Sequence, residues 1–180
     1  MRKMSYVKMT ILCALSIALC VVLPMAFHAI PGAGFILLPM HIPVLLCGLI
    51  CGWGFGLLAG IAGPLLSGLI TGMPPPVIIP GMMVELAVYG FVSGLMMQLL
   101  RTKKIYADLY ISLVTAMLAG RIAAGIYMAL VFAAGDYSMA AWITSFFVTS
   151  LPGMLIQIAF IPGIVFALEA ARLIPKRYQG

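Results

Sequence analysis

Lysine and arginine side chains gather in three short clusters, and the long stretches between them carry almost no charge. The clusters lie at positions 2–8, 101–104 and 172–177. The stretches between them contain apolar runs long enough to cross a bilayer, and the cytoplasmic loops of membrane proteins retain Lys and Arg. All three clusters are therefore expected on the cytoplasmic face, and each interval between them must contain an even number of membrane crossings.

The residue composition agrees with a chain that is embedded in lipid. Of the 180 residues, 64% are hydrophobic and 8% are charged, which is typical of an integral membrane protein. The net charge of +6 is accounted for by the three clusters on the inner face, since no basic stripe alternates with aromatic residues. The lipid bilayer is thus an expected partner, and nucleic acid is not.

The apolar stretches divide into six expected helices within one domain, 1–180. The stretch from residue 35 to 71 is too long for one crossing, and the sequence Gly-Trp-Gly at 52–54 supplies a break. A proline-rich run at 72–81 requires an outer loop. The fold predicted is an all-α integral membrane protein with both termini cytoplasmic, and its approximate helices are 9–27, 35–52, 54–71, 81–100, 107–133 and 142–173.

Two alternatives to this topology can be weighed from the sequence. A five-helix chain, in which the second and third helices merge, would put either the middle cluster or the tail on the outer face, against the distribution of positive charge. The first apolar run follows a basic start like a secretory signal, but further spans follow it and no convincing cleavage site is present. We therefore expect a retained first helix and six crossings.

Polar side chains within the expected spans are few, and a buried ionisable group there usually has a partner or a function. Glu85 and Tyr89 are four residues apart and project from one face of a helix. Arg121 is the one basic residue far from the inner surface, and its planar guanidinium suits capture of a carboxylate or an amide-rich ligand. An internal ion pair between Glu85 and Arg121 is the alternative, and a pair that opens for a ligand would satisfy both interpretations.

Other candidates are less specific. His41 and Thr71 lie in the outer halves of their helices, and a lone interfacial histidine is more often structural. Gln157 lies near the midplane, where an amide needs partners, so a binding role and a structural role stay open. Tyr127, Tyr137 and Trp142 could stack on a flat ligand, although aromatic residues at this depth are commonly interfacial anchors.

The sequence offers no basis for catalysis or for a cofactor. The four cysteines fall inside spans as small apolar residues, without ligands at a metal-binding spacing. There is no nucleotide-binding glycine-rich loop with its lysine, no paired-histidine motif and no context for a nucleophilic serine. We expect a non-enzymatic protein without a metal or cofactor, and any ATP hydrolysis must take place in partner subunits.

Several segments together resemble a known family over essentially the whole chain. They are the small-residue pair Ala14 and Ala18, the run GFILLPMHIP at 34–43, the loop SGLITGMPP at 67–75 and the sequence ELAVYG at 85–90. In this order they resemble the S component, the substrate-binding membrane subunit of energy-coupling factor vitamin transporters. The pattern around His41 is most similar to members assigned to pantothenate.

The resemblance implies a multi-pass protein of a prokaryotic plasma membrane. Such a subunit captures a vitamin or precursor from outside and docks on a transmembrane coupling subunit that carries two ATPases. Ala14 and Ala18 match the docking motif. The pocket would lie near the outer surface, under the loops after the first, third and fifth helices, and its contacts would be His41, Thr71, Glu85, Tyr89, Arg121 and Gln157.

The resemblance leaves the substrate open. For pantothenate, Arg121 would take the carboxylate, with Glu85 and Gln157 taking hydroxyl and amide groups. A pyridoxine-type vitamin or a queuosine precursor would use Glu85 and aromatic side chains instead. A self-sufficient carrier is the alternative from another class, but no inner polar half of a pathway is evident, and inverted repeats are not visible.

Overall fold

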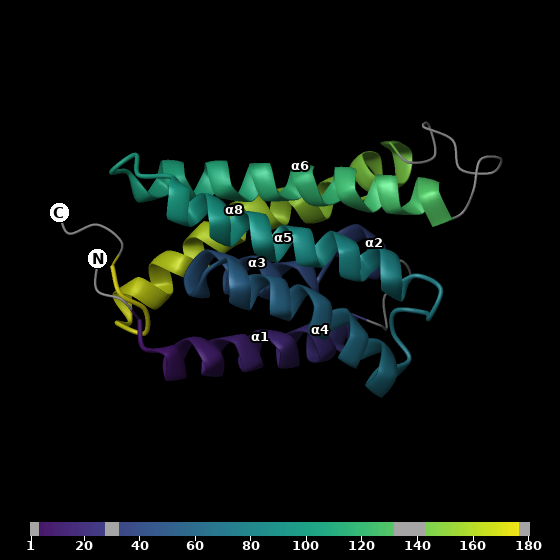
Figure 1. Ribbon diagram of the computed structural model, residues 1–180, viewed down its shortest axis with the longest axis horizontal. Helices are drawn as coiled ribbons and strands as arrows, with labels where there is room; N and C mark the ends of the chain where they lie inside the picture. Colours follow the sequence, from purple (N-terminus) through teal and green to yellow (C-terminus); the bar gives the residue numbers. More distant parts are fainter. Residues whose placement is uncertain (1–3, 28–32, 132–142, 177–180) are drawn as a thin grey trace.

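The computed structural model describes residues 4–27, 33–131 and 143–176. These residues form helices and no strands, and they assemble into an elongated bundle (Figure 1). The elements are α1 (Tyr6–Phe27), α2 (Ala33–Leu37), α3 (His41–Cys51), α4 (Trp53–Thr71), α5 (Ile79–Leu99), α6 (Ile105–Val131), the short π-helix η1 (Thr144–Val148) and α8 (Leu151–Ala170).

Five of these helices are long and apolar enough to cross a membrane: α1, α4, α5, α6 and α8. The predicted all-α membrane class is thereby confirmed for the described part of the chain. The shorter apolar helix α3 follows α2 where the sixth crossing was predicted. That sixth crossing, and the cytoplasmic location of both termini, stay predictions.

Two expected helices are divided in the structure. The segment 35–52 becomes α2, a turn and α3, and the segment 142–173 becomes η1 followed by α8. Pro39 explains the first division, because proline disfavours a helical backbone at the residue before it. Leu38 leaves the right-handed helical conformation, with a positive φ of 52°, and the His41 N–H donates to the Leu38 carbonyl at the start of α3 (3.1 Å).

Gly52 makes the break between α3 and α4. Its φ of 96° is one that residues with a side chain rarely adopt, and its N–H donates to the Gly48 carbonyl at the end of α3 (2.9 Å). The single-residue break lets α4 pack directly on α3. The sequence Gly-Trp-Gly therefore separates two helices as predicted.

The backbones of α3, α4 and α5 touch at glycines. A Cβ added at Gly90 would overlap the backbone of Gly56, and one added at Gly60 would overlap that of Leu86. Gly94 meets the backbone of Trp53 in the same way. Small residues allow this close approach where lipid supplies no hydrophobic drive for association. α5 is thus fixed against the α3–α4 pair along its length.

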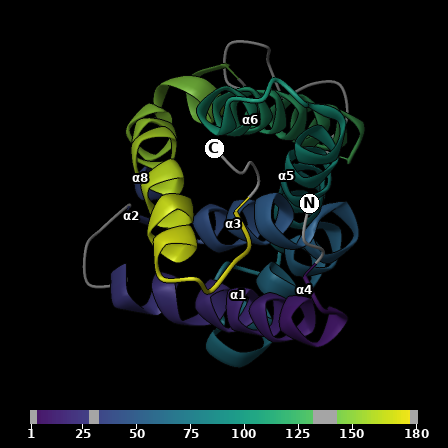
Figure 2. The same ribbon diagram turned by 90° about the vertical axis from the view of Figure 1, so that its left-hand side faces the viewer.

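The outer helices cover this central group. α1 packs on α3 and α4, whereas α6 packs on α5. Figure 2, a view along the bundle, shows α1 and α6 on opposite sides, with α8 beside them and α3 in the middle. α8 contacts α2, α3 and α6. Among the described helices, α8 with α2 beside it covers the side of the bundle opposite α5 (Figure 2).

The described residues of all three basic clusters lie at one end of the bundle. That end, called the terminal end below, holds the first and last described residues and the turn between α5 and α6 (Figure 1). Its exposed basic residues are Lys8, Arg101, Lys103, Lys104, Arg172 and Lys176. Arg2, Lys3 and Arg177 lie outside the described residues. The loop at 72–78 connects α4 and α5 at the opposite end (Figure 1).

The main hydrophobic core fills the half of the bundle nearer the termini. α3, α5 and α8 run toward this end and α6 runs away from it (Figure 1), so residues late in the first three helices meet residues early in α6. Its buried side chains include Leu45, Leu49, Met97, Leu109, Leu113, Met117, Ile161, Val165 and Ile174. Asp108 is also buried here, and it accepts a hydrogen bond from the Thr102 hydroxyl in the α5–α6 turn (2.6 Å).

Gly90→Ala should destabilise the protein, because the new methyl group would meet the backbone of Gly56 and force α4 and α5 apart. Overpacking of this kind costs about 1–3 kcal/mol, so we expect a lower midpoint of thermal unfolding in detergent. Gly54→Ala is the matched control, since open space surrounds that position. Equal midpoints for the two variants would contradict tight packing at Gly90.

Candidate functional site

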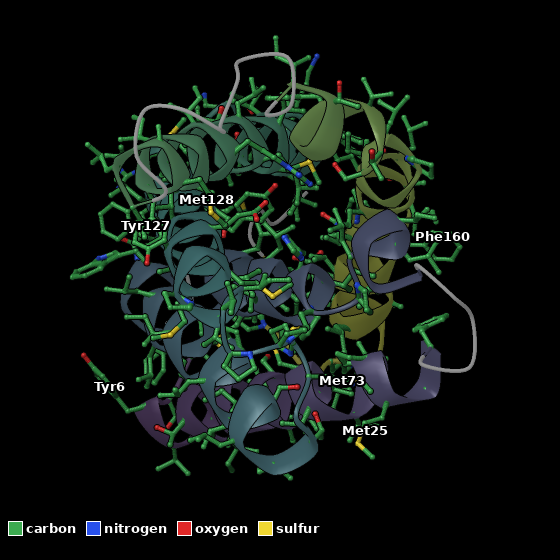
Figure 3. All side chains as sticks on the ribbon, turned by 90° about the vertical axis from the view of Figure 1, so that its right-hand side faces the viewer. Tyr6, Met25, Met73, Tyr127, Met128 and Phe160 are labelled. Atoms are coloured by element: carbon green, nitrogen blue, oxygen red, sulfur yellow. The ribbon has the colours of Figure 1, made fainter. Side chains whose placement is uncertain are left out.

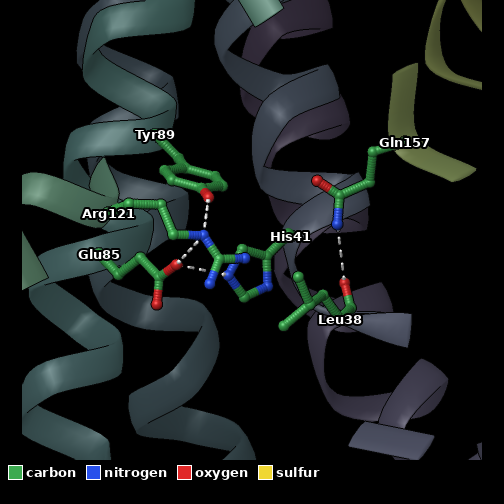
Figure 4. A network of polar contacts seen from close by, with 6 residues as sticks. All are labelled: Leu38, His41, Glu85, Tyr89, Arg121 and Gln157. Carbon is green, nitrogen blue, oxygen red and sulfur yellow. Dashed lines mark hydrogen bonds and ion pairs between the residues drawn. The ribbon is translucent and has the colours of Figure 1, made fainter. Parts of the chain in front are cut away.

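Five polar side chains from four helices are buried near the middle of the bundle (Figure 4). α3 contributes His41, α5 contributes Glu85 and Tyr89, α6 contributes Arg121 and α8 contributes Gln157. None is more than 7% exposed. Polar groups are costly to bury in such surroundings, so their convergence marks this network as the candidate site.

The Glu85 carboxylate lies between two basic side chains. Its Oε1 atom is 3.4 Å from Nε2 of His41 and 3.4 Å from Nε of Arg121. The internal ion pair between Glu85 and Arg121 that the sequence suggested is therefore present. Because His41 begins α3, the turn at Pro39 is what brings its ring to this carboxylate.

Tyr89 links the same two basic groups from one helical turn further along α5. Arg121 Nε donates a hydrogen bond to the Tyr89 hydroxyl oxygen (3.0 Å). The Tyr89 ring also meets the His41 ring nearly at right angles, with 5.1 Å between the ring centroids. Gly120 leaves room for this ring, since a Cβ added there would overlap the Tyr89 side chain. Four groups thus hold one another in place.

Gln157 approaches from the opposite side. Its Nε2 atom donates to the backbone carbonyl of Leu38, in the turn between α2 and α3 (3.5 Å). Gln157 Oε1 and His41 Nδ1 are among the buried atoms of the described residues that have no hydrogen-bond partner, and neither takes part in the contacts around Glu85. A site with unused hydrogen-bonding capacity can bind a polar ligand.

Thr71 is not brought into this network. Its hydroxyl donates to the Ser67 carbonyl (2.8 Å) at the end of α4. The Ser67 hydroxyl donates to the Met73 carbonyl (2.7 Å), and the Met73 N–H donates to the Thr71 hydroxyl (3.2 Å). These bonds fix the start of the loop after α4. The remaining five predicted contacts come together.

The other predicted positions lie away from the network. Ala14 and Ala18 are exposed on α1. Tyr127 is half-buried on α6, and Figure 3, which faces the end opposite the termini, shows it beside Met128. His28, Tyr137, Trp142 and the loop at 135–139 lie outside the described residues.

Two contributors to the site were missed in the sequence. Leu38 acts through its carbonyl, and a backbone acceptor leaves no residue-type signal, although the adjacent Pro39 indicates a break. Gly120 acts by lacking a side chain, and nothing in the sequence distinguishes it from other helical glycines. The cysteines are buried in α1 and α3, and no group of three or more metal-ligating side chains occurs among the residues that the structure describes.

Spanning-length helices enclose a buried polar network, so the protein has the build of a membrane-embedded protein, and this network is the candidate binding site. The family model described as "ECF transporter, substrate-specific component" matches residues 7–167. The chain therefore belongs to the substrate-specific components of energy-coupling factor transporters. Comparisons with curated proteins and with solved structures gave no match. Members are substrate-binding transport subunits, multi-pass and generally non-catalytic, that work with a transport module.

Glu85→Gln should lower the stability of the ligand-free protein, because it leaves the Arg121 guanidinium without its buried counter-charge. Breaking a buried pair in this way costs about 3–5 kcal/mol, which thermal unfolding in detergent would detect. Glu169→Gln, a half-buried position near the end of α8, should cost no more than about 1 kcal/mol. An unchanged midpoint for Glu85→Gln would show that the pair contributes nothing to folding.

Proposed function

We propose that this protein captures pantothenate at its outer face and delivers it through an ATPase-driven coupling module. The observation that carries this proposal is the buried network of Glu85, His41, Arg121, Tyr89 and Gln157 in a chain of the substrate-specific family. The side chains of this network suit a small molecule that has an anionic end and a neutral polar end. Catalysis plays no part in this function.

Arg121 is the proposed partner of the carboxylate of the vitamin. Its contact with Glu85 is 3.4 Å, which is longer than the roughly 2.7–2.9 Å of a strong charge-assisted hydrogen bond. A ligand carboxylate that makes two short, parallel bonds to the guanidinium would gain more than this contact gives. The ion pair can therefore open for a ligand while Glu85 stays paired with His41.

Pantothenate has a carboxylate, an amide and two hydroxyl groups, so it matches a site that combines a guanidinium with neutral hydrogen-bonding groups. A pyridoxine-type vitamin or a queuosine precursor has no carboxylate, so the ion pair between Arg121 and Glu85 would stay intact when it binds. These compounds are the competing substrates. Thr71 is proposed to shape the rim of the pocket through its bonds to the loop after α4.

The entrance is proposed at the end of the bundle opposite the termini. The exposed basic residues at the terminal end favour a cytoplasmic location for it, which leaves the other end to face outward. Among the described residues, the side chains that pack between the site and the terminal end are mainly apolar, which argues against a self-sufficient carrier. Release inward then depends on a partner.

Helix α1 is the proposed docking face for the coupling subunit, which is expected to work with two ATPases. Ala14 and Ala18 are exposed and one helical turn apart, so they allow a partner helix to approach closely. Their flanks carry the exposed apolar side chains of Ile11 and Val22. In this assembly the chain supplies recognition, and the partners supply energy.

Pantothenate should bind the detergent-purified protein, and Arg121→Met should weaken binding at least tenfold by removing the proposed carboxylate partner, a charged contact worth about 1.5–3 kcal/mol. Titration calorimetry with pantothenate, pyridoxine and a queuosine precursor would measure this. Arg172→Met, an exposed change in the tail, is the control. Equal affinity after the Arg121 change would remove that residue from the site, and selective binding of another compound would replace the proposed substrate.

Ala14→Trp should block association with the coupling subunit and leave pantothenate affinity unchanged, because the indole fills the space that a partner helix needs. Co-purification of the complex from membranes would measure association. Leu118→Trp adds similar bulk to an exposed position on α6, on the opposite side of the bundle (Figure 2), and should assemble normally. Normal assembly of the Ala14 variant would exclude this face.

A further inference from the structure

The side of the site formed by α8 differs chemically from the side formed by α5 and α6. Glu85 and Arg121 form an ion pair on one side, whereas Gln157 is a neutral amide on the other. In Figure 4 the His41 ring lies between these two groups. Gln157 Oε1 and His41 Nδ1 belong to fully buried side chains and are among the atoms of the described residues without a hydrogen-bond partner; unlike His41 Nε2 and Glu85 Oε1, they make no ion-pair contact either.

The orientation of the Gln157 amide follows from its partner. A backbone carbonyl can only accept a hydrogen bond, so the NH₂ group must face Leu38 and the amide oxygen must face away from it. The Leu38 carbonyl is itself held in place, because it also accepts the His41 N–H (3.1 Å). α8 is fixed against the same segment, since a Cβ at Gly153 would lie 2.5 Å from the Ile36 carbonyl oxygen.

His41 is oriented by the same kind of argument. Its Nε2 atom faces the Glu85 carboxylate, which accepts hydrogen bonds, so the ring proton is placed on Nε2. A ring that carries its single proton on Nε2 presents Nδ1 as an acceptor. Both atoms without partners consequently seek a hydrogen-bond donor, and neither can satisfy the other.

We propose that Gln157 Oε1, assisted by His41 Nδ1, recognises a hydroxyl donor at the end of the ligand remote from its anionic group. This inference rests on the proposed function and adds an orientation to it: the carboxylate faces Arg121, and the hydroxyl end faces α8. The substrate class is thus a hydroxylated small acid. A ligand with an ether or ketone at that end would place an acceptor against acceptors and should be rejected.

The test combines protein variants with ligand analogues on the full chain in detergent. The ligands are pantothenate, pantothenol, in which an alcohol replaces the carboxylate, and the pantothenate analogue in which both hydroxyls are methyl ethers. Gln157→Met removes the acceptor at similar length, and Gln98→Met is the matched control on the exposed end of α5. Unfolding midpoints verify that each variant is folded.

The wild-type protein should bind the dimethyl ether at least tenfold more weakly than pantothenate, the loss expected for unpaired buried acceptors. Gln157→Met should weaken pantothenate binding about tenfold and largely abolish the preference for pantothenate over its dimethyl ether. The preference for pantothenate over pantothenol should persist in this variant. Gln98→Met should change neither preference. This pattern assigns the hydroxyl end to α8.

Two other results overturn the inference and separate it from the proposed function. In the first, the wild-type protein binds pantothenate, but Gln157→Met weakens the binding of pantothenate and of its dimethyl ether equally. This result would leave the proposed function standing and would make Gln157 a structural link to Leu38. Failure of the wild-type chain to bind pantothenate or any other hydroxyl-bearing compound of the vitamin panel overturns both.

Discussion

The buried carboxylate of Glu85 is the interaction on which the rest of the site depends. It is placed in an apolar bundle, where an unpaired charge would be prohibitive, and its two partners come from different helices. Because His41 belongs to α3 and Arg121 to α6, one carboxylate fixes the register of both helices against α5. The Tyr89 hydroxyl and ring reinforce the same register.

Two kinds of contact hold the helices together, and they differ in how firmly they fix each helix. α5 meets α3 and α4 through glycine backbones, which leave little freedom to slide. α8 packs closely on α2 at Gly153, but it joins the polar network itself through one long hydrogen bond, from Gln157 to the carbonyl of Leu38, whose φ is positive. The side of the site that contacts the ion pair is therefore the rigid one, and the α8 side has the weaker attachment.

Much of this could be predicted from residue types. Ionisable side chains stand out in an apolar chain, so residue type alone indicates Glu85 and Arg121, and length and hydropathy indicate the spanning helices. Thr71 was grouped with them by depth alone, and depth does not show that its hydroxyl turns to the neighbouring loop. The Leu38 carbonyl and the space at Gly120 have no side-chain signal, so only three-dimensional packing could identify them.

The position of the apolar core bears on how a bound ligand could leave. Leu45, Leu113 and Ile161 lie on the terminal side of the polar network, so a charged ligand moving that way would lose its partners and meet hydrocarbon. Under the proposed function, release of the ligand therefore requires a rearrangement of the helices that the coupling partners drive. α8 joins the polar network through one long hydrogen bond, so its movement would break the fewest contacts of the site.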